Sequence, residues 1–233
     1  TLATDRNGTA SKAYSFDGTN DYIQTTVYPD SDSFSASGWF FVNSLNGQWQ
    51  YLFIDGNSNP GDDVWAGINS EGKFYFKTKD EHAVNSVSAV STGQWHHFVC
   101  VADAIENTKT LWIDGAKAAE ATNWTGTANV GNHYNMTLGA FKDGSSTHSY
   151  LLGKLDEVRI YNRALSATEV SELHTLELPP PPTITAQPMN VIAAVGATAS
   201  FEVNATGATA YQWYKDGGVL AGQTGATLTL ANL

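Results

Sequence analysis

Aromatic side chains in several polar segments of this sequence stand next to amide, carboxylate and imidazole groups. The segments are 48–51, 62–65, 123–124 and 132–135, together with the surroundings of His148. A sugar presents a flat CH face and a rim of hydroxyls, so its site combines an aromatic platform with amide and carboxylate partners. The pattern therefore predicts a carbohydrate-binding surface. The residues that would form it are Trp49, Tyr51, Trp65, Trp124, His133, Tyr134 and His148.

The seven tryptophans divide by the residues around them. Four lie in strand-like runs and are expected in the core: Trp39, Trp95, Trp112 and Trp213. The other three, Trp49, Trp65 and Trp124, have hydrophilic neighbours and are expected at the surface. An exposed aromatic patch would itself indicate a binding surface.

The chain is acidic and sparsely charged. Its 233 residues carry 12 Lys and Arg against 23 Asp and Glu, a net charge of −11, and only 15% of residues are charged. An average globular protein has about 25% charged residues. No basic patch is available to neutralise phosphates, which argues against nucleic acid as a partner. No run of about 18 apolar residues occurs, so no membrane span is predicted.

The spacing of histidine and cysteine indicates neither a zinc site nor a thiol nucleophile. The six histidines show no His-x3-His spacing, and a single cysteine cannot make a Cys-x2-Cys pair. His96 and His97 are adjacent in a strand-like run, so their side chains are expected on opposite faces. Cys100 follows in the same run and is expected to be a small buried residue. The alternative, a catalytic thiol, needs an electropositive surrounding that this acidic chain lacks.

Short strands are expected to position these side chains. Apolar or alternating runs recur along the first 161 residues, and four Asp-Gly dipeptides punctuate them. Many short strands between turns predict an all-β sandwich or jelly roll. The expected strands cover residues 13–16, 22–27, 34–42, 51–54, 64–68, 74–77, 96–102, 110–113, 136–140 and 153–161. One helix is expected, with Ser166 as its N-cap, Glu169 three residues on, and its end near His174.

A proline run marks a domain boundary. Residues 178–183 read LPPPPT, the composition of an extended, semi-rigid linker. We therefore expect one domain over residues 1–177 and a second over 184–233. All but one of the 12 basic residues and all but two of the 23 acidic residues precede the linker.

Four motifs in the first segment resemble the LamG-like (laminin G, concanavalin A-like) jelly-roll family. They are AYSFDGTNDYI at 13–23, FSASGWF at 34–40, WHHFVCV at 95–101 followed by LWIDG at 111–115, and GKLDEVRIYNRALS at 153–166. Their order is that of the family, and they cover residues 13 to about 175. The resemblance implies a concanavalin A-like jelly-roll β-sandwich. It does not imply one ligand, because the family includes binding proteins, adhesins and enzymes.

The resemblance also implies a structural calcium ion, held by Asp156 of the closing strand beside Asp17 and Asp21 of the N-terminal hairpin. Carboxylates spread over turns suit an oxygen-ligand Ca²⁺ site, and neutralising them would stabilise a chain that has no disulfide. The alternative is that Asp17 and Asp21 are turn residues and that Asp156 pairs with Arg159 or Lys154.

Catalytic patterns of enzymes that share this jelly roll are missing from the sequence. Retaining glycoside hydrolases on the fold resemble one another in a Glu-x-Asp-x-x-Glu strand, and no such triplet occurs here. We therefore expect a non-catalytic carbohydrate-binding module with a glycan ligand. The few Lys and Arg residues disfavour highly sulfated or uronic polysaccharides and favour neutral glycans. The expected setting is a larger secreted or cell-surface bacterial protein, such as a polysaccharide-degrading enzyme. The alternatives are a protein-binding adhesion module and, less favoured, a glycan-active enzyme.

The second segment is similar to bacterial immunoglobulin-like domains. The matching stretches are PTITAQP at 182–188, GATASFEV at 196–203, YQWYKDG at 211–217 and ATLTL at 226–230. No cysteine is present to form the disulfide found between strands B and F of some relatives. The segment is expected to be an incomplete Ig-like β-sandwich that lacks strands F and G, with the parent protein continuing beyond it.

Overall fold

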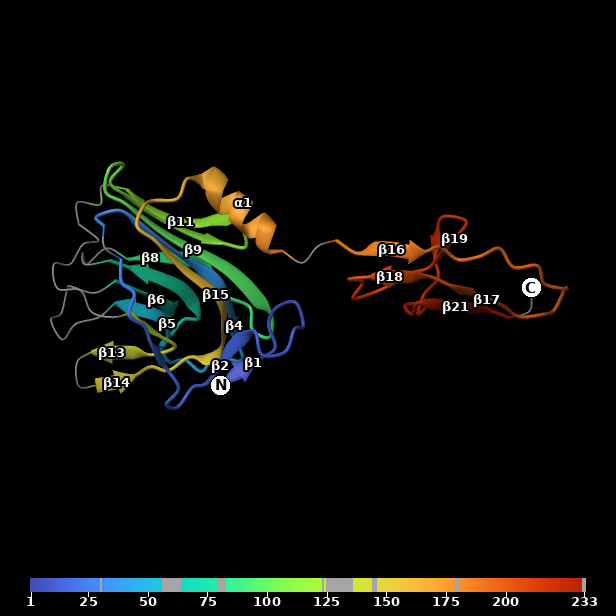
Figure 1. Cartoon of the computed structure of the whole chain (residues 1–233), viewed down its shortest axis with the longest axis horizontal. Helices are drawn as coiled ribbons and strands as arrows, with labels where there is room; N and C mark the ends of the chain where they lie inside the picture. The colour runs from blue at the N-terminus through green and yellow to red at the C-terminus, as the bar shows by residue number, and fades with distance from the viewer. Residues whose placement is uncertain are drawn as a thin grey trace. The chain divides into compact units, whose positions relative to one another are not determined.

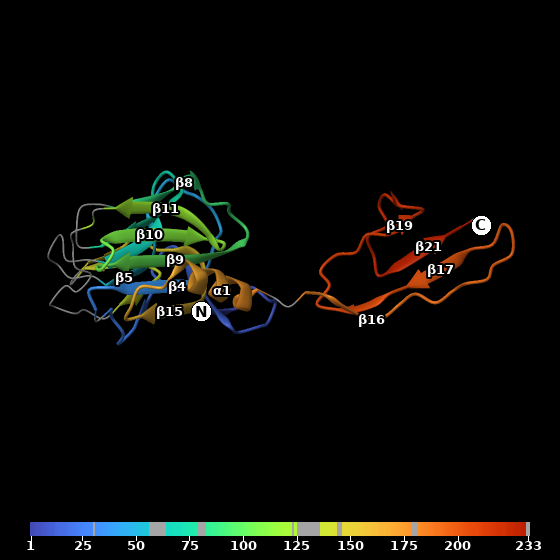
Figure 2. The same cartoon turned by 90° about the horizontal axis from the view of Figure 1, so that it is seen from above.

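The computed structural model divides the chain into two compact units, Thr1–Glu177 and Leu178–Leu233 (Figures 1 and 2). It describes residues 1–29, 31–55, 64–78, 83–122, 124, 136–143, 146–178 and 181–231. Regular structure in these residues is antiparallel β apart from one helix, which confirms the all-β prediction. No helix in the described ranges is long and apolar enough to cross a bilayer.

The first unit is a sandwich of two sheets (Figure 1). One sheet has seven strands in the order β1 (Leu2–Ala3), β2 (Ala13–Asp17), β15 (Leu152–Tyr161), β4 (Phe34–Val42), β9 (Trp95–Asp103), β10 (Thr108–Ile113) and β11 (Ala116–Thr122). The other has six strands in the order β3 (Ile23–Gln24), β12 (Thr137–Leu138), β5 (Gln50–Asp55), β6 (Val64–Ile68), β7 (Lys73–Lys77) and β8 (Val84–Ala89). A separate hairpin joins β13 (Phe141–Asp143) to β14 (Ser146–His148).

Alternating side chains of both sheets fill the space between them. Phe40 of β4 and Phe98 of β9 are fully buried in this core, as are Phe74 and Phe76 of β7. Burying one such side chain contributes roughly 1.5–3 kcal/mol. The core therefore fixes which face of each strand turns outward.

The expectation that His96 and His97 lie on opposite faces of their strand is confirmed. The His96 ring lies 5.4 Å from Phe40, a core residue, whereas the His97 ring lies 5.1 Å from Trp39 on the outer side of the sheet. Cys100 is fully buried, as predicted, and this burial raises the pKa of its thiol.

Helix α1 (Ala167–Glu177) covers the outer face of the seven-stranded sheet, where Val170 packs in one cluster with Val99 and Val101 of β9. The Ser166 hydroxyl accepts from the Glu169 N–H at 3.3 Å, and the Glu169 carboxylate accepts from the Ser166 N–H at 2.9 Å. This reciprocal pair is the predicted capping arrangement. The predicted end near His174 is wrong, because the helix continues for three more residues to Glu177.

The described residues of the second unit form three two-stranded sheets. The pairs are β16 (Thr183–Ala186) with β18 (Asn204–Thr206), β17 (Ala199–Glu202) with β21 (Thr227–Leu230), and β19 (Tyr214–Lys215) with β20 (Gly218–Val219). Among its described hydrophobic residues, only Ala199 and Leu228 are buried. The core of this unit is therefore small, and its similarity to Ig-like domains stays a prediction.

Candidate functional site

Aromatic rings gather on the outer face of the six-stranded sheet. Val64 and Ala66 of β6 point into the core, so the alternation of the strand turns Trp65 outward. The Trp65 ring centroid lies 5.0 Å from that of Tyr51 on β5, with the planes 22° apart, and 5.0 Å from that of Tyr75 on β7. Trp49, just before β5, has its centroid 5.0–6.0 Å from all three.

Strand register and one glycine produce this arrangement. Tyr51, Gly67 and Tyr75 occupy one row across β5, β6 and β7. A Cβ atom at Gly67 would lie 2.4 Å from the carbonyl oxygen of Gln50, so only glycine fits there. Trp65, two residues earlier on the same face, contacts both tyrosines across the space that the glycine leaves open.

The β13–β14 hairpin extends the cluster. Phe141 and His148 are directly opposite each other, and their rings stack at 4.7 Å with planes 18° apart. The Phe141 centroid lies 5.0 Å from that of Tyr51 and 6.2 Å from that of Trp65. The Tyr51 N–H donates to the carbonyl of Ser149 at 3.2 Å, which ties the end of the hairpin to β5. We call the six rings the aromatic face: Trp49, Tyr51, Trp65, Tyr75, Phe141 and His148.

Exposure differs across the aromatic face. Tyr51 is only 6% exposed and is covered by its neighbours, whereas Trp65 and Tyr75 are partly exposed and His148 is exposed. Polar groups flank the rings: the Lys77 ammonium lies 5.6 Å from the Trp65 ring centroid, and exposed Asn85 of β8 is opposite Tyr75. The face can therefore stack against the CH face of a sugar while polar side chains at its edge reach hydroxyls.

The structure brings together four of the seven residues predicted to bind a ligand: Trp49, Tyr51, Trp65 and, through Phe141, His148. Sequence reasoning missed Tyr75 and Phe141. The sequence KFYFK of β7 contains a usable signal for Tyr75, because alternation sends both phenylalanines inward and the tyrosine outward. His133 and Tyr134 lie outside the described residues.

The family model of the concanavalin A-like lectin/glucanases superfamily matches residues 17–171. This is more than half of the chain. The chain belongs to this superfamily. No curated protein matches it.

Solved structures share the superfamily fold at low sequence identity. The CBM40 of the Ruminococcus gnavus IT-sialidase, bound to α2,3-sialyllactose, has a TM-score of 0.58 at 13% identity, covering 70% of this chain and 97% of that one. The native heptameric SAP-like pentraxin from Limulus polyphemus has a TM-score of 0.57 at 15% identity, covering 70% and 81%. The NanB sialidase from Streptococcus pneumoniae has a TM-score of 0.57 at 17% identity, covering 94% of this chain and 38% of that one. At these identities the similarity establishes the fold alone.

Trp124 does not lie on the surface of this superfamily member, contrary to the prediction. Its side chain is 2% exposed and belongs to the core cluster, and the Lys109 ammonium lies 5.8 Å from its ring centroid. The backbone N–H of Trp124 donates to the Asn107 carbonyl at 2.9 Å, which holds this residue next to the start of β10. The hydrophilic neighbours of Trp124 in the sequence gave no indication of this burial.

The three predicted calcium ligands do not form one site. Asp17 is opposite Leu152 in the pairing of β2 with β15, and Asp156 is four residues further along β15. At about 3.3 Å per residue the two acids are roughly 13 Å apart along the strand. Ca²⁺ ligands lie about 2.3–2.6 Å from the ion, so these two carboxylates cannot share one. No group of three or more His, Cys, Asp or Glu in the described ranges, which include Asp21, could hold a metal ion.

Asp17 and Asp156 have other partners. The Asp17 carboxylate accepts from the N–H groups of Thr19 and Asn20, and these hydrogen bonds lower its pKa. This is the turn role considered as the alternative. Asp156 accepts from the Arg6 guanidinium at 2.8 Å, rather than from the predicted Arg159 or Lys154. Burial raises the pKa of Asp156 despite the opposing effect of Arg6.

A buried polar cluster joins the end of α1 to the outer face of the seven-stranded sheet. The Glu177 carboxylate accepts from the indole N–H of Trp39 at 2.6 Å and from the Arg159 guanidinium. The Arg6 Nε–H donates to the Glu177 carbonyl at 3.0 Å. His97 Nε2 lies 3.7 Å from the Glu177 carboxylate. The cluster attaches the helix and the N-terminal segment to the sheet.

Ser91, His96 and Asp114 form a hydrogen-bonded chain of the kind used by hydrolases. His96 Nε2 lies 2.8 Å from the Ser91 hydroxyl, and Nδ1 lies 2.7 Å from the Asp114 carboxylate. The Gln94 amide also donates to the Ser91 hydroxyl, and Asp114 accepts from the His97 N–H at 2.9 Å. We interpret the chain as structural, since these contacts fix the turn after β10 against the start of β9.

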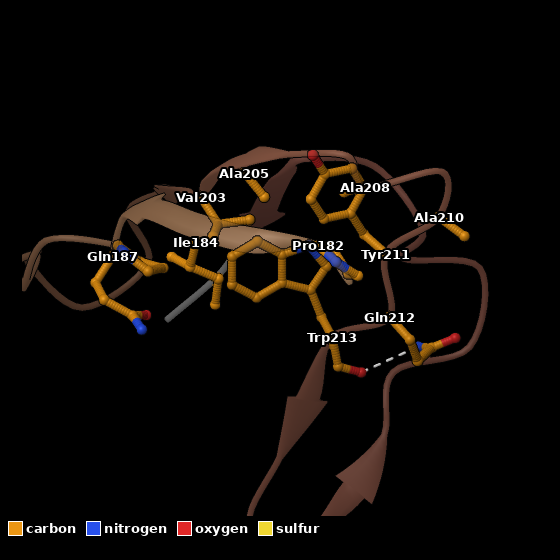
Figure 3. A pocket seen from close by; sticks show the side chains of 11 residues that line it. Pro182, Ile184, Gln187, Val203, Ala205, Ala208, Ala210, Tyr211, Gln212 and Trp213 are labelled. Carbon is orange, nitrogen blue, oxygen red and sulfur yellow. Dashed lines mark hydrogen bonds between the residues drawn. The ribbon is translucent and has the colours of Figure 1, made fainter. Parts of the chain in front are cut away.

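The second unit has a pocket of about 400 Å³ (Figure 3). Trp213 lies at its centre with Tyr211, Ile184 and Val203 around it. The indole N–H of Trp213 donates to the Gly225 carbonyl at 2.8 Å. Trp213 is only partly buried and lines this pocket, so its predicted core position is wrong. Of the stretch 211–217, Tyr214–Lys215 form a strand.

Proposed function

We propose that the first unit is a non-catalytic carbohydrate-binding module and that its ligand lies on the aromatic face. The observation that carries this proposal is the contact of Trp49 and Trp65 with each other and with both tyrosines on an outward sheet surface. Contiguous apolar surface that is accessible to solvent marks interaction sites, and Trp49, Trp65 and Tyr75 are each partly exposed. Structural neighbours that are carbohydrate-binding domains support the proposal.

We further propose that the glycan is neutral and that the module acts outside the cell as part of a larger protein. The net charge of −11 disfavours polyanionic glycans. Lys73 lies on the outward side of β7, and its ammonium is paired with the Glu71 carboxylate at 2.8 Å. This pairing neutralises a positive charge that an acidic sugar would otherwise bind.

Affinity electrophoresis of the full chain in gels containing xylan, arabinan, β-glucan, galactomannan or polygalacturonate tests the proposal. We expect retardation by at least one neutral polysaccharide. Trp65→Ala and Trp49→Ala should each weaken that binding about tenfold, equivalent to about 1.4 kcal/mol. Trp213→Ala, a tryptophan of the second unit, is the matched control and should leave the binding unchanged.

Thermal melts of each variant separate lost binding from lost folding. Binding that survives both single variants in folded protein would place the site elsewhere. No retardation by any polysaccharide would favour the protein-binding adhesion module, and release of reducing sugar by the chain would favour an enzyme.

A further inference from the structure

We propose that the second unit mediates self-association, with residues 189–195 of one copy occupying the apolar pocket around Trp213 of a second copy. The glycan ligand proposed for the first unit plays no part in this exchange. Four features of the second unit support it: the lining of the pocket, the free strand edges, the exposure of the segment and the distribution of charge.

The pocket around Trp213 has an apolar lining (Figure 3). Ile184 of β16 and Ala205 of β18 are directly opposite each other, so both face the same side of this strand pair, and both line the pocket. No charged residue is among those that line it, and its volume of about 400 Å³ falls in the range of sites that hold a ligand. Apolar side chains are therefore its most favourable occupants.

Strands β16 and β18 also have free edges. They pair with each other and, in the described part of the chain, with no other strand. Each therefore presents unpaired N–H and C=O groups along one edge. A segment that enters as a strand can add to such an edge through backbone hydrogen bonds while its alternate side chains fill the pocket.

The segment 189–195 has the composition of such a strand. It reads MNVIAAV, lies outside the strands of the structure, and leaves Ile192 and Val195 fully exposed. In an extended conformation alternate side chains share one face, and the face formed by positions 189, 191, 193 and 195 is apolar throughout. Its β-branched residues favour strands. The chain thus displays both an apolar pocket and an exposed apolar segment suited to it.

The segment leads away from the pocket of its own copy. Gln187 and Pro188 line the pocket, and the segment begins with the next residue. Among the described residues its backbone makes a single hydrogen bond, in which the Ala194 carbonyl accepts from the Ala197 N–H at 3.0 Å. The segment of a second copy can reach the pocket without reversing the chain at Pro188. Because the exchange is reciprocal, two copies fill both pockets and form a closed two-fold dimer.

The distribution of charge favours a second copy over an acidic or basic protein. The charged residues of the second unit are Lys215, Glu202 and Asp216, and none of them belongs to the pocket or to the segment. Nearly all other charged residues of the chain belong to the first unit. Electrostatic repulsion between two copies of the second unit is therefore small.

Sedimentation equilibrium of the full chain, from about 1 to about 500 µM, tests the proposal. We expect the mass to rise from that of one chain, 25.0 kDa, to that of two. The dissociation constant should be about 10–100 µM, because the interface is small. A mass of one chain over the whole range, or growth past two chains, would overturn the proposal.

An aspartate in the segment tests where the copies meet. Ile192→Asp should weaken the dimer at least about tenfold, because it brings a charge into an apolar pocket. Since Ile192 is fully exposed in the single copy, the fold of the unit does not depend on it. Ile105→Asp, the same substitution at an exposed residue of the first unit, is the matched control and should leave the dissociation constant unchanged. A dimer that Ile192→Asp does not weaken would contradict this interface.

A synthetic peptide of residues 187–197 tests the pocket directly. Added in excess, it should convert the dimer to monomers, whereas the same peptide carrying Ile192→Asp should not. Failure of the unchanged peptide to dissociate the dimer would argue against exchange of this segment. Binding of the peptide by a chain that stays monomeric at every concentration would assign the pocket to a strand of another protein and overturn the proposal of a second copy.

Discussion

His97 shows how one residue in a strand can be committed to structure rather than to a ligand. Its side chain is 1% exposed, and neither ring nitrogen has a hydrogen-bond partner among the described residues. The rings of Trp39 and His174 lie 5.1 and 5.3 Å away, and Glu177, Arg6, Arg159 and Asp114 are the charged groups that face it. Burial, followed by the neighbouring His174, lowers the pKa of His97 to about 4.

This lowered pKa predicts loss of stability in acid. In the unfolded chain His97 has a pKa of about 6.5, whereas in the folded protein its pKa is about 4. Between these two values the unfolded state binds a proton that the folded state does not, so the free energy of unfolding falls as the pH drops from 7 to 4. The contribution is on the order of 3 kcal/mol at about 1.4 kcal/mol per pKa unit. Urea unfolding at pH 7.5 and pH 4.5 should show a smaller acid loss for His97→Gln than for wild type. An equal loss in both proteins would contradict the assignment.

At the scale of elements, the strands in the interior of the two sheets were the predictable ones. Residues 34–42 and 64–68 coincide with β4 and β6, because their alternating or continuous apolar patterns reflect burial. β8 and β11 were not predicted: VNSVSA and AKAAEAT carry few large apolar residues, since these strands are at the sheet edges and their outer sides face solvent. The β13–β14 hairpin, a separate two-stranded sheet, was missed because FKD and STH together contain one large apolar residue.

The ion pair between Arg6 and Asp156 joins the N-terminal segment to strand β15. Asp156→Asn removes the partner of a mostly buried guanidinium and should cost roughly 3 kcal/mol of unfolding free energy. The loss, measured by urea denaturation, should be the same in EDTA and in calcium. Glu120→Gln, which breaks the exposed pair with Lys117, is the control and should cost less than about 1 kcal/mol. Stabilisation by calcium in wild type that disappears in Asp156→Asn would restore Asp156 as a calcium ligand.

At the scale of the whole molecule, all six residues of the aromatic face belong to the first unit. The fold of that unit could be predicted because its motifs are spread over the whole sandwich. The site was only partly predictable, because it depends on register: Gly67 places Tyr51 and Tyr75 in one row, and nothing in the local sequence shows that Phe141 joins them. Trp124 has equally polar neighbours and is nevertheless buried.

The most direct test of the central claim is an NMR titration of the full chain with the polysaccharide-derived hexamer that binds most tightly, following the seven indole N–H signals. We predict that the signals of Trp49 and Trp65 shift in proportion to ligand occupancy, while those of Trp39, Trp112 and Trp213 stay in place. Shifts confined to these last three tryptophans, with Trp49 and Trp65 unmoved at saturation, would contradict the assignment of the aromatic face as the glycan-binding site.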